Sequence, residues 1–475
     1  MNKRKTKIVA TIGPVTSSKE NLKKLIKSGV NVCRLNFSHS THQEHVDVIK
    51  NIRDIDSELG THTAILGDLQ GPKIRIGEVK DNNIELVPGA EIIITTNSVL
   101  GTAEKVSITY QGLPQDVKTG EQILLDDGKL MFEVISTNLK DEVKLKVIHG
   151  GYLSSKKGVN LPNTKISQPS LTEKDKKDLE VILEHNLDWI GLSFVRSPRD
   201  IIELKHIISQ NKKQTKVVAK IEKPEAIIEI DAIVKESDAV MVARGDLGVE
   251  IPMQNVPLIQ KKIITTCLNH AKPVIVATQM MESMTENAAP TRAEVNDVAN
   301  AVMDGADAVM LSGETSVGKY PFTTVEAMCK ILEKIESDYE EMYSKEREPE
   351  KDIERFITDS ICFTSCRLAS RVGAAGIITM THSGYTAYKI SSQRPKAAVF
   401  VFSGNRKLLT QLSLVWGVNT FYYDKTVSTD HTIADIKYLL KKEGYVTTGD
   451  MIINTASIPI EESGKTNMMK MSVVE

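Results

Sequence analysis

Eight short apolar runs, rich in valine and isoleucine, recur through the first three quarters of the chain and constrain its fold more than any other feature. Longer segments of helical periodicity separate most of them, a pattern typical of βα units around a parallel sheet. The runs are Lys7–Gly13, Val30–Asn36, Ala64–Gly71, Trp189–Val195, Val217–Glu222, Ala239–Gly245, Pro273–Met280 and Ala308–Gly313. Parallel strands covered on both faces read as nearly continuous apolar runs. We therefore expect an α/β fold built on a (β/α)8 TIM barrel.

The regular spacing is interrupted once, between the third and fourth runs. From Ile76 to Lys165 the chain shows short alternating segments separated by turn pairs such as Pro88-Gly89 and Asp127-Gly128. This pattern of alternating segments and turns is typical of a small antiparallel β-domain. We expect a small β-barrel domain inserted after the third barrel strand.

A third domain is expected beyond the barrel. The charged stretch Glu326–Asp352 suggests a solvated linker helix, and from Phe356 onward four more apolar runs alternate with helical patterns. Together these features predict a C-terminal α/β domain. The expected boundaries are 1–70 and 167–340 for the two parts of the barrel, 71–166 for the inserted domain and 341–475 for the C-terminal domain.

The amino-acid composition argues against some classes of binding partner and indicates a cellular compartment. The 475 residues include 60 basic and 62 acidic side chains, a net charge of −2, so no bulk charge favours nucleic acid or a membrane surface. No apolar run is long enough to span a bilayer, and no cleavage site follows the basic start. The five cysteines form no CxxC pair, which indicates reduced thiols and a cytoplasmic protein.

Polar residues end several of the apolar runs. In a barrel these positions converge on one mouth, where active sites are built. The candidates are Arg34, Asn36, Ser38, Asp68, Lys73, Arg75, Lys220, Glu222, Arg244, Gly245, Asp246, Thr278, Ser312 and Glu314. A guanidinium is rarely buried unless it is paired, so arginines at the ends of buried runs indicate an anion site that could hold phosphate and carboxylate.

Lys220, Glu222 and Asp246 form the most informative group. Lys220 and Glu222 lie two residues apart on a strand, so both side chains face the same way. Two carboxylates with room for phosphate oxygens suit a divalent cation such as Mg2+. A structural Lys220–Glu222 ion pair and a turn-capping role for Asp246 are the alternatives.

Two other motifs have structural explanations. Gly313–Lys319 matches GxxxxGK, but Tyr320 stands where a P-loop needs Ser or Thr. His39, His42 and His45 have metal-ligand spacing, yet the Thr41–Glu44 segment reads as a capping box at a helix start. We expect neither a P-loop nor a histidine metal site.

Taken together, these segments closely resemble the pyruvate kinase family over essentially the whole chain. The motifs that carry the resemblance are Lys7–Pro14, Arg34–His39, Gly71–Arg75, Lys156–Pro162, Ala219–Glu222, Met241–Gly248 and Ala277–Met284. The resemblance implies transfer of the phosphoryl group of phosphoenolpyruvate to ADP, giving pyruvate and ATP in the last step of glycolysis. The family architecture it implies is the barrel, inserted β-domain and C-terminal α/β domain expected above.

The resemblance also implies roles for the candidate residues. Glu222 and Asp246 would hold Mg2+ or Mn2+, Arg34 and Lys220 the transferring phosphoryl, and Gly245, Asp246 and Thr278 the substrate carboxylate. Thr278, Ser312 and Glu314 are candidates for relaying a proton to the enolate. Arg75, Asp127, Lys156 and Lys157 would bind the nucleotide as the inserted domain closes.

One departure from the family pattern concerns potassium. Family members that require K+ carry glutamate where this chain has Lys73. In members resembling this one, the lysine ammonium replaces the potassium charge. The residues of the family's monovalent-cation site are here Asn36, Ser38, Asp68 and Leu69. We expect activity without K+.

In the C-terminal domain, Thr381, Ser383, Gly384 and Thr386 resemble a phosphate-cradling effector loop, with a plain helix cap as the alternative. The family's bisphosphate pocket also uses a basic or aromatic loop near the chain end, where this chain reads Pro459–Gly464 with two glutamates. We therefore expect a sugar-monophosphate or AMP effector. The resemblance favours a homotetramer.

Two rival functions remain open at this point. A Mg2+-dependent barrel lyase or aldolase acting through a pyruvate enolate would use Arg34, Glu222 and Asp246, but would leave the inserted domain unexplained. A non-catalytic relative would be expected to have lost one of the catalytic groups, and Lys220 and Thr278 are both present.

Overall fold

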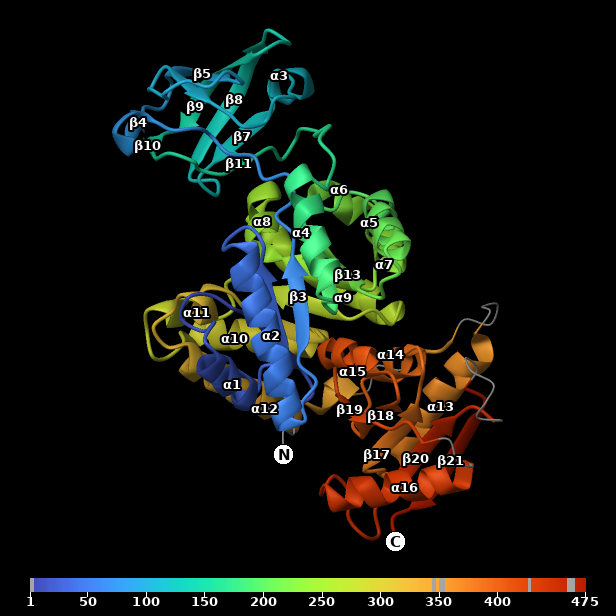
Figure 1. Ribbon diagram of the computed structural model, residues 1–475. Helices are drawn as coiled ribbons and strands as arrows, with labels where there is room; N and C mark the ends of the chain where they lie inside the picture. Colours follow the sequence, from blue (N-terminus) through green and yellow to red (C-terminus); the bar gives the residue numbers. More distant parts are fainter. Residues whose placement is uncertain (1–3, 344–346, 350–354, 426–428, 459–465) are drawn as a thin grey trace.

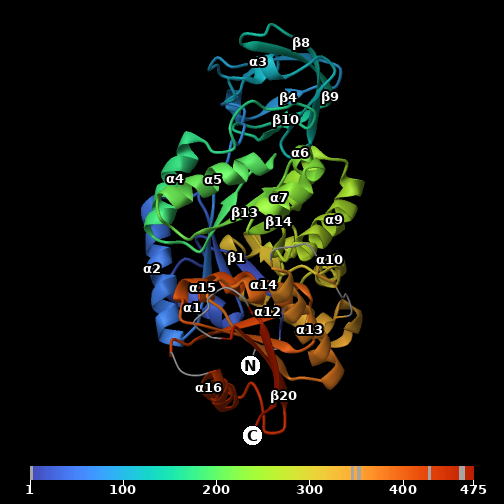
Figure 2. The ribbon, with the colours of Figure 1, turned by 90° about the vertical axis from the view of Figure 1, so that its right-hand side faces the viewer.

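Three bodies follow one another along an elongated molecule. The computed structural model describes residues 4–343, 347–349, 355–425, 429–458 and 466–475. The inserted β-domain lies at one end, the barrel in the middle and the C-terminal α/β domain at the other end (Figure 1). A view from the side shows the same order (Figure 2).

The barrel is formed by the eight apolar runs. Its strands are β1 (Lys7–Thr11), β2 (Val32–Asn36), β3 (Ala64–Asp68), β12 (Trp189–Leu192), β13 (Lys216–Ile221), β14 (Ala239–Ala243), β15 (Val274–Ala277) and β16 (Ala308–Leu311). They are parallel and close in the order β1-β16-β15-β14-β13-β12-β3-β2. Nearly every position of these strands is buried, as continuous apolar runs require. The predicted barrel is confirmed.

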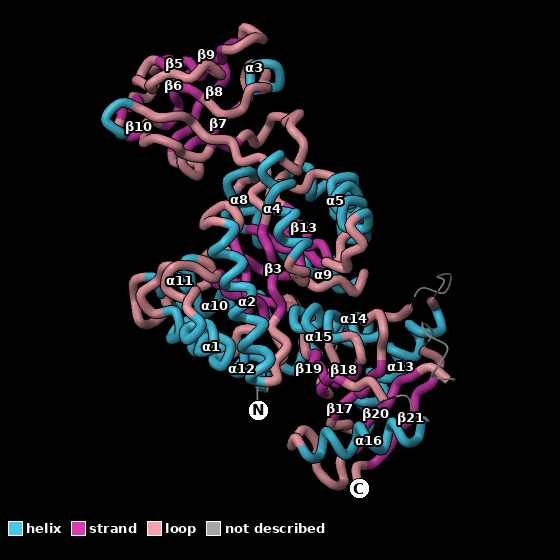
Figure 3. Tube along the Cα trace, viewed as in Figure 1, coloured by secondary structure: helices cyan, strands magenta, loops and turns pink. Residues whose placement is uncertain are grey.

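Helices surround the barrel strands (Figure 3). They are α1 (Lys19–Ser28), α2 (His42–Leu59), α4 (Glu173–Glu184), α5 (Pro198–Gln210), α6 (Pro224–Ile228), α7 (Ile230–Glu236), α8 (Arg244–Glu250), α9 (Val256–Asn269), α10 (Arg292–Asp304), α11 (Gly313–Ser316) and α12 (Pro321–Asp338). Short 3-10 helices cover Lys80–Asn82, Met253–Asn255, Glu282–Thr285, Glu340–Tyr343 and Leu412–Leu414. Within the described residues, no helix combines the length and apolarity needed to cross a bilayer.

Two helices test the sequence patterns. The expected capping box at Thr41 and Glu44 starts α2, so His42 and His45 lie in a first helical turn. The expected solvated linker helix is wrong for its first part, because α12 buries Met328 and Leu332 against the barrel. Residues 344–346 and 350–354 of that stretch lie outside the described residues.

The inserted domain follows β3. Its elements are β4 (Ile84–Leu86), β5 (Glu91–Thr95), β6 (Lys105–Ser107), α3 (Leu113–Asp116), β7 (Gln122–Leu125), β8 (Leu130–Thr137), β9 (Glu142–His149), β10 (Gly151–Leu153) and β11 (Val159–Asn160). A six-stranded sheet and the two-stranded β10-β4 sheet surround one apolar core of their own. Pairing is antiparallel apart from β5 with β6. The small β-domain expected from the alternating segments is therefore present.

The C-terminal domain is a five-stranded α/β sheet of order β19-β18-β17-β20-β21. Its elements are α13 (Phe356–Val372), β17 (Gly376–Met380), α14 (Tyr385–Ser392), β18 (Ala398–Ser403), α15 (Arg406–Gln411), β19 (Val418–Tyr422), α16 (Thr429–Lys442), β20 (Met451–Ala456) and β21 (Met468–Val473). The first four strands match the predicted runs. The edge strand β21 is antiparallel to β20 and was missed, because half of its residues are polar or exposed methionines.

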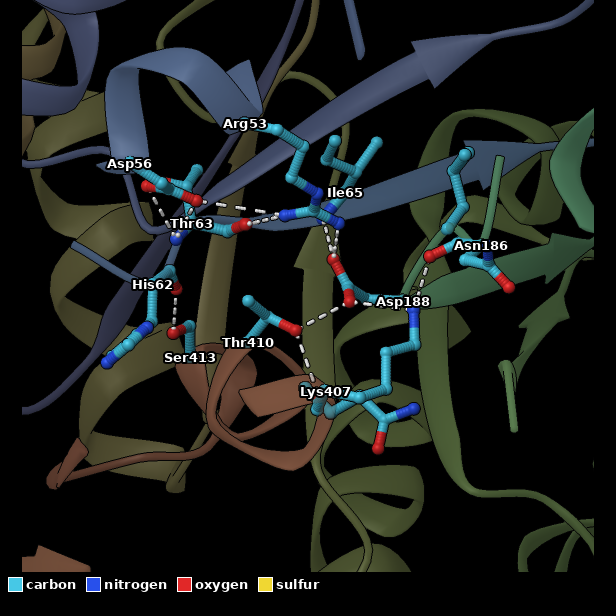
Figure 4. A network of polar contacts seen from close by, with 12 residues as sticks. Arg53, Asp56, His62, Thr63, Ile65, Asn186, Asp188, Lys407, Thr410 and Ser413 are labelled. Atoms are coloured by element: carbon cyan, nitrogen blue, oxygen red, sulfur yellow. Dashed lines mark hydrogen bonds and ion pairs between the residues drawn. The ribbon is translucent and has the colours of Figure 1, made fainter. Parts of the chain in front are cut away.

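A buried carboxylate joins the C-terminal domain to the barrel. Asp188, directly before β12, is fully buried and accepts hydrogen bonds from Arg53 on α2 and from the Ile65 amide on β3 (Figure 4). From α15, the Lys407 ammonium lies 2.9 Å and the Thr410 hydroxyl 2.6 Å from its other oxygen. One side chain thus fixes two barrel elements and one helix of the neighbouring domain.

Candidate active site

The mouth of the barrel holds two cations on one buried carboxylate. Asp68, the last residue of β3, accepts Arg34 Nε at 2.7 Å and Nη2 at 2.6 Å through one oxygen. Its other oxygen lies 3.2 Å from Lys220 Nζ. Burial would raise the pKa of Asp68, but the charges of Lys220 and Arg34 outweigh it and lower that pKa. The mouth is therefore built around fixed positive charge.

Close packing across the sheet makes this arrangement possible. Gly191 on β12 stands opposite Asp68 in the register of the two strands. A Cβ at Gly191 would lie 2.8 Å from Asp68 Oδ1, so a larger residue there would displace the carboxylate. Beside it, Ser193 accepts a hydrogen bond from Lys220 Nζ at 2.6 Å. Arg34 also donates to Thr11 at 3.0 Å, so both cations are oriented.

Glu222 and Asp246 supply the carboxylates of the predicted metal site. Glu222 is 1% exposed, accepts the Phe194 amide at 2.8 Å and lies 3.0 Å from Lys220 Nζ. Burial, reinforced by the charge of Asp246, raises the pKa of Glu222 to about 7 against the opposing charge of Lys220. A buried carboxylate whose proton affinity is raised by the charge of a second carboxylate favours a bound cation.

This donor set fits a magnesium ion. In the part of the chain that the structure describes, no group of three or more His, Cys, Asp or Glu side chains forms a metal cluster. Mg2+ is commonly bound by one or two carboxylates and completes its shell with water and substrate phosphates. Glu222 and Asp246 therefore suffice, and the predicted ion pair of Lys220 with Glu222 is present as well.

Thr278 occupies a strained position at the end of β15. Its φ is +69°, and that of Gln279 is +57°, a region that β-branched residues rarely adopt. Arg244 donates to the Thr278 carbonyl at 2.7 Å and pairs with Asp297 at 2.6 Å. The Gly245 amide donates to Thr278 Oγ1 at 2.8 Å. Strain held in this way is characteristic of functional sites.

Glu314 and Ser312 lie at the next strand end. Glu314 is buried, and its two oxygens accept the backbone amides of Ser312 at 2.6 Å and Met281 at 3.2 Å. Burial raises the pKa of Glu314 above its ordinary value. The carboxylate thus fixes the loops after β15 and β16, and it holds the Ser312 backbone directly. The GxxxxGK segment begins with the short helix α11 (Gly313–Ser316).

A cleft between the inserted domain and the barrel brings other predicted residues together. Lys73, Asp127, Arg244, Gly245 and Asp246 line a space of about 1350 Å3. A second part of this cleft, about 550 Å3, adds Asn160, Lys223 and Glu250 to Lys73, Asp127 and Asp246. Asp127 reaches the cleft from the turn after β7, where its φ is +55°.

The other predicted nucleotide residues make contacts within the inserted domain. Lys156 pairs with Glu78 at 2.8 Å, and Lys157 pairs with Asp126 at 2.8 Å. Arg75 donates to the Lys156 carbonyl at 2.9 Å. Only Asp127 of this predicted group lines the cleft in the structure.

The residues of the predicted monovalent-cation site lie at the adjoining ends of β2 and β3, where Asn36 stands opposite Asp68 in the register. Asp68 is engaged by the two cations, the Asn36 side chain accepts the Ser38 amide at 3.1 Å, and Leu69 is buried. Within the described residues, the Lys73 ammonium forms no hydrogen bond or ion pair. It lines the cleft beside Asp127 and Asp246 instead.

The predicted effector loop is a tight turn before α14. Thr381 accepts the Gly384 amide at 3.0 Å, and the Thr386 hydroxyl is buried 2.9 Å from that of Thr466. Gly384 has φ +83°, which explains the glycine. The acidic segment Pro459–Gly464 lies outside the described residues.

Sequence reasoning missed several contributors to the site. Ser193 orients Lys220. Glu250 accepts Lys223 Nζ at 2.7 Å and Asn160 Nδ2 at 2.9 Å, which ties the inserted domain to the barrel. Ser193 directly follows β12 within the fourth apolar run, a signal that could have found it. Glu250 is the last residue of helix α8 and has no distinguishing pattern.

Comparison with known proteins identifies the family. A family model described as the pyruvate kinase barrel domain matches residues 3–325, and one described as the pyruvate kinase alpha/beta domain matches residues 359–472. The chain belongs to the pyruvate kinase family. The two family models together cover the barrel with its inserted domain and the C-terminal domain described above.

Individual relatives agree with this assignment. Pyruvate kinases of Staphylococcus aureus strains MRSA252 and bovine RF122 / ET3-1 are each 44% identical over 474 residues, covering 99% of this chain and 80% of theirs. A crystal structure of a pyruvate kinase from Cryptosporidium parvum superposes with a TM-score of 0.92 at 36% identity, covering 99% of this chain and 96% of that one. The family activity, phosphoryl transfer from phosphoenolpyruvate to ADP, is therefore the activity of this enzyme. The lyase alternative finds no support.

Proposed function

We propose that Arg34 and Lys220 bind the phosphoryl group of phosphoenolpyruvate during its transfer to ADP. The observation that carries this proposal is the buried Asp68 carboxylate, which fixes both cations before substrate arrives. Phosphoryl transfer depends mainly on positioning and on neutralising charge. Donors that are already oriented lose little energy to reorganisation when charge develops. Lys220 also neutralises the enolate that the transfer leaves behind.

Glu222 and Asp246 hold the Mg2+ or Mn2+ ion of the enzyme in this proposal. When bound, the ion neutralises negative charge on the substrate oxygens. The buried, proton-attracting carboxylate of Glu222 supports the assignment. The backbone amides of Gly245 and Asp246, with the Thr278 hydroxyl, bind the substrate carboxylate. In the structure the Gly245 amide already faces Thr278 Oγ1.

A proton must reach the methylene carbon of enolpyruvate, and Thr278, Ser312 and Glu314 are the proposed relay. The strained backbone of Thr278 sets the direction of its hydroxyl, which donates to the Ala277 carbonyl at 2.6 Å in the structure. Glu314 is oriented by two backbone amides. We assign it the role of positioning Ser312 and of exchanging the relayed proton with the Ser312 hydroxyl.

The inserted domain closes over the nucleotide in this proposal. Asp127 lines the cleft, whereas Lys156 and Lys157 are paired with Glu78 and Asp126. The Lys156–Glu78 pair is exposed, so little energy holds it. Closure therefore exchanges these carboxylates for nucleotide phosphates, with Arg75 beside them, and excludes water from the transfer.

We further propose that the enzyme needs no K+, because Lys73 supplies a fixed positive charge at the cleft. Its ammonium lines the same cleft as Asp127 and Asp246 and is not neutralised by any described carboxylate. Asn36, Ser38, Asp68 and Leu69 would then form at most a residual cation site. The remaining proposals are a homotetramer in the cytoplasm, the domain boundaries at 71, 167 and 341, and a sugar-monophosphate or AMP effector at Thr381–Thr386.

One experiment tests the assignment and the role of Lys73 together. Pyruvate formation from phosphoenolpyruvate, ADP and Mg2+ is measured in K+ and in tetramethylammonium buffer, for the wild type and Lys73→Glu. We expect wild-type activity in both buffers and K+-dependent activity in the variant. A wild type that stays inactive until K+ is added would refute the role of Lys73. Absence of pyruvate in both buffers would refute the assignment of the catalytic residues.

A further inference from the structure

One buried carboxylate forms the polar contact between the inserted domain and the barrel. Glu250, the last residue of α8, accepts a hydrogen bond from Asn160 Nδ2 of β11 at 2.9 Å. Within residues 74–165, all of which are described, this hydrogen bond is the one that reaches the barrel beyond the connecting residues 166–170. Figure 1 shows α8 at the end of the barrel that faces the inserted domain.

The strand that carries Asn160 also carries groups of the proposed nucleotide site. Asn160 lies three residues after Lys157. It stands opposite Leu124 of β7 in the antiparallel pairing of β11 with β7, and the turn after β7 carries Asp127. The position of Asn160 over the barrel therefore sets the positions of Lys157 and Asp127 as well.

The turn after β7 approaches the same end of α8. A Cβ built at Gly128 would lie 3.6 Å from Val249 Cγ1, and Val249 directly precedes Glu250. The other end of α8 carries Gly245 and Asp246, which belong to the proposed substrate and metal sites. One helix of 7 residues thus carries substrate groups at its start and meets the inserted domain at its end.

The barrel holds the Glu250 carboxylate in place. Lys223 Nζ lies 2.7 Å from Glu250 Oε1, and the two side chains are only 5% and 1% exposed. Lys223 directly follows Glu222 of the proposed metal site. Oε1 accepts both Lys223 and Asn160, whereas Oε2 is buried and has no hydrogen-bond partner in the part of the chain that the structure describes. An unpaired buried acceptor is costly, so a second arrangement that uses Oε2 is favourable.

We propose that Glu250 is a positioning residue, the pivot on which the inserted domain turns as it closes over the nucleotide. The inference rests on the closure proposed above and names the group that guides it. Asn160 passes from Oε1 to Oε2 of one carboxylate during closure, while Lys223 keeps that carboxylate fixed. Without this bond, the inserted domain is joined to the barrel by its chain connections but is oriented less well over the nucleotide.

Steady-state kinetics of the full-length enzyme test the pivot. Asn160→Leu removes the amide and leaves the Lys223–Glu250 pair intact, and Asn163→Leu, at an exposed asparagine of the same segment, is the matched control. We expect Asn160→Leu to raise the KM for ADP about tenfold and to leave the KM for phosphoenolpyruvate within about twofold of the wild type. The control should behave as the wild type does. An unchanged KM for ADP in Asn160→Leu, or an equal rise in both KM values, would overturn the proposal.

A reaction without nucleotide separates positioning from damage to the barrel. The methyl hydrogens of pyruvate exchange with D2O through the enolate, and in the presence of Mg2+ and inorganic phosphate this exchange uses the barrel residues alone. Proton NMR follows it. We expect Asn160→Leu to exchange at the wild-type rate. A loss of exchange that parallels the loss of ADP affinity would place the effect in the barrel site and overturn the pivot.

A second background tests whether Asn160 acts through Glu250. Lys223→Met with Glu250→Leu replaces the buried pair by apolar side chains, a change that proteins often tolerate. In this background Asn160→Leu should leave the KM for ADP unchanged, because the bond is already absent. A further rise there would overturn the role of Glu250. If the background does not fold, Asn160→Asp decides: its carboxylate cannot donate to Glu250, so a KM for ADP like that of the wild type would overturn the proposal.

Failure of the pivot can be told apart from failure of the proposed closure. Lys156→Gln with Lys157→Gln should raise the KM for ADP if the inserted domain closes over the nucleotide. A wild-type KM in this variant would refute the closure and, with it, the pivot. A raised KM in this variant together with an unchanged KM in Asn160→Leu would overturn the pivot alone.

Discussion

Asp188 gives the sharpest test of how the C-terminal domain is held to the barrel. Its buried carboxylate accepts hydrogen bonds from Arg53, the Ile65 amide, Lys407 and Thr410 (Figure 4). Replacement by alanine leaves two cations, one amide and one hydroxyl without their acceptor. Removing one partner from a buried charged network costs about 3–5 kcal/mol.

The structure places the expected loss at the lower end of that range. Arg53 is 33% and Lys407 23% exposed, so water partly compensates both. We expect Asp188→Ala to lower the free energy of unfolding by about 3 kcal/mol and Lys407→Met to lower it by about 1 kcal/mol. The double variant should lose less than the sum, by about 1 kcal/mol, because the two side chains contact each other.

Fluorescence can follow this region directly. The chain has two tryptophans, Trp189 next to Asp188 and Trp416, so a Trp416→Phe background leaves Trp189 as the reporter in denaturant titrations. Burial would raise the pKa of Asp188, but the charges of Arg53 and Lys407 outweigh it and lower that pKa. The stabilisation is therefore complete at pH 7 and is lost as pH falls through the lowered pKa. A loss below about 1 kcal/mol at pH 7 would refute the reasoning.

Two further predictions concern the barrel. Lys220→Met should reduce kcat by about 100-fold to 1000-fold in a pyruvate-formation assay, since it removes an oriented charge, and activity within about tenfold of the wild type would contradict this role. Lys7 is buried, and burial, with the charge of Arg4, lowers its pKa to about 7. Between pH 7 and its unfolded pKa, Lys7 binds fewer protons in the folded state, so stability should rise with pH there. Lys7→Met should flatten this rise in thermal unfolding measured at pH 7 and pH 9, and an unchanged slope would count against the assignment.

Much of the fold follows from the sequence because the barrel strands are buried on both faces. A continuous apolar run such as Trp189–Val195 is then enough to predict a buried strand. β21 gives no such signal, because an edge strand pairs on one side only and tolerates exposed residues such as Lys470. The linker prediction failed for a related reason: α12 carries charges on one face and buries Leu332 on the other.

The sequence predicts which residues lie at the site, but it does not predict which of them pair with one another. Strand-end positions marked Arg34, Asp68 and Lys220, yet periodicity cannot show that one carboxylate serves both cations. Asp127 of the inserted domain and Asp246 of the barrel line one cleft, and such an arrangement depends on how two separately folded bodies are oriented. Backbone strain at Thr278 likewise arises from contacts with Arg244 and has no local sequence signature.

The place of the insertion has a consequence for how the chain folds. In the barrel, Leu66 of β3 pairs with Trp189 of β12, and Lys7 of β1 pairs with Ala308 of β16. The inserted domain lies between β3 and β12 in sequence, and its strands pair with one another. During synthesis the inserted domain can therefore fold while one edge of β3 is still unpaired. That edge can pair with other chains and aggregate until β12 has been synthesised. We expect barrel closure to be the slow phase of folding, with the inserted domain folding early and independently.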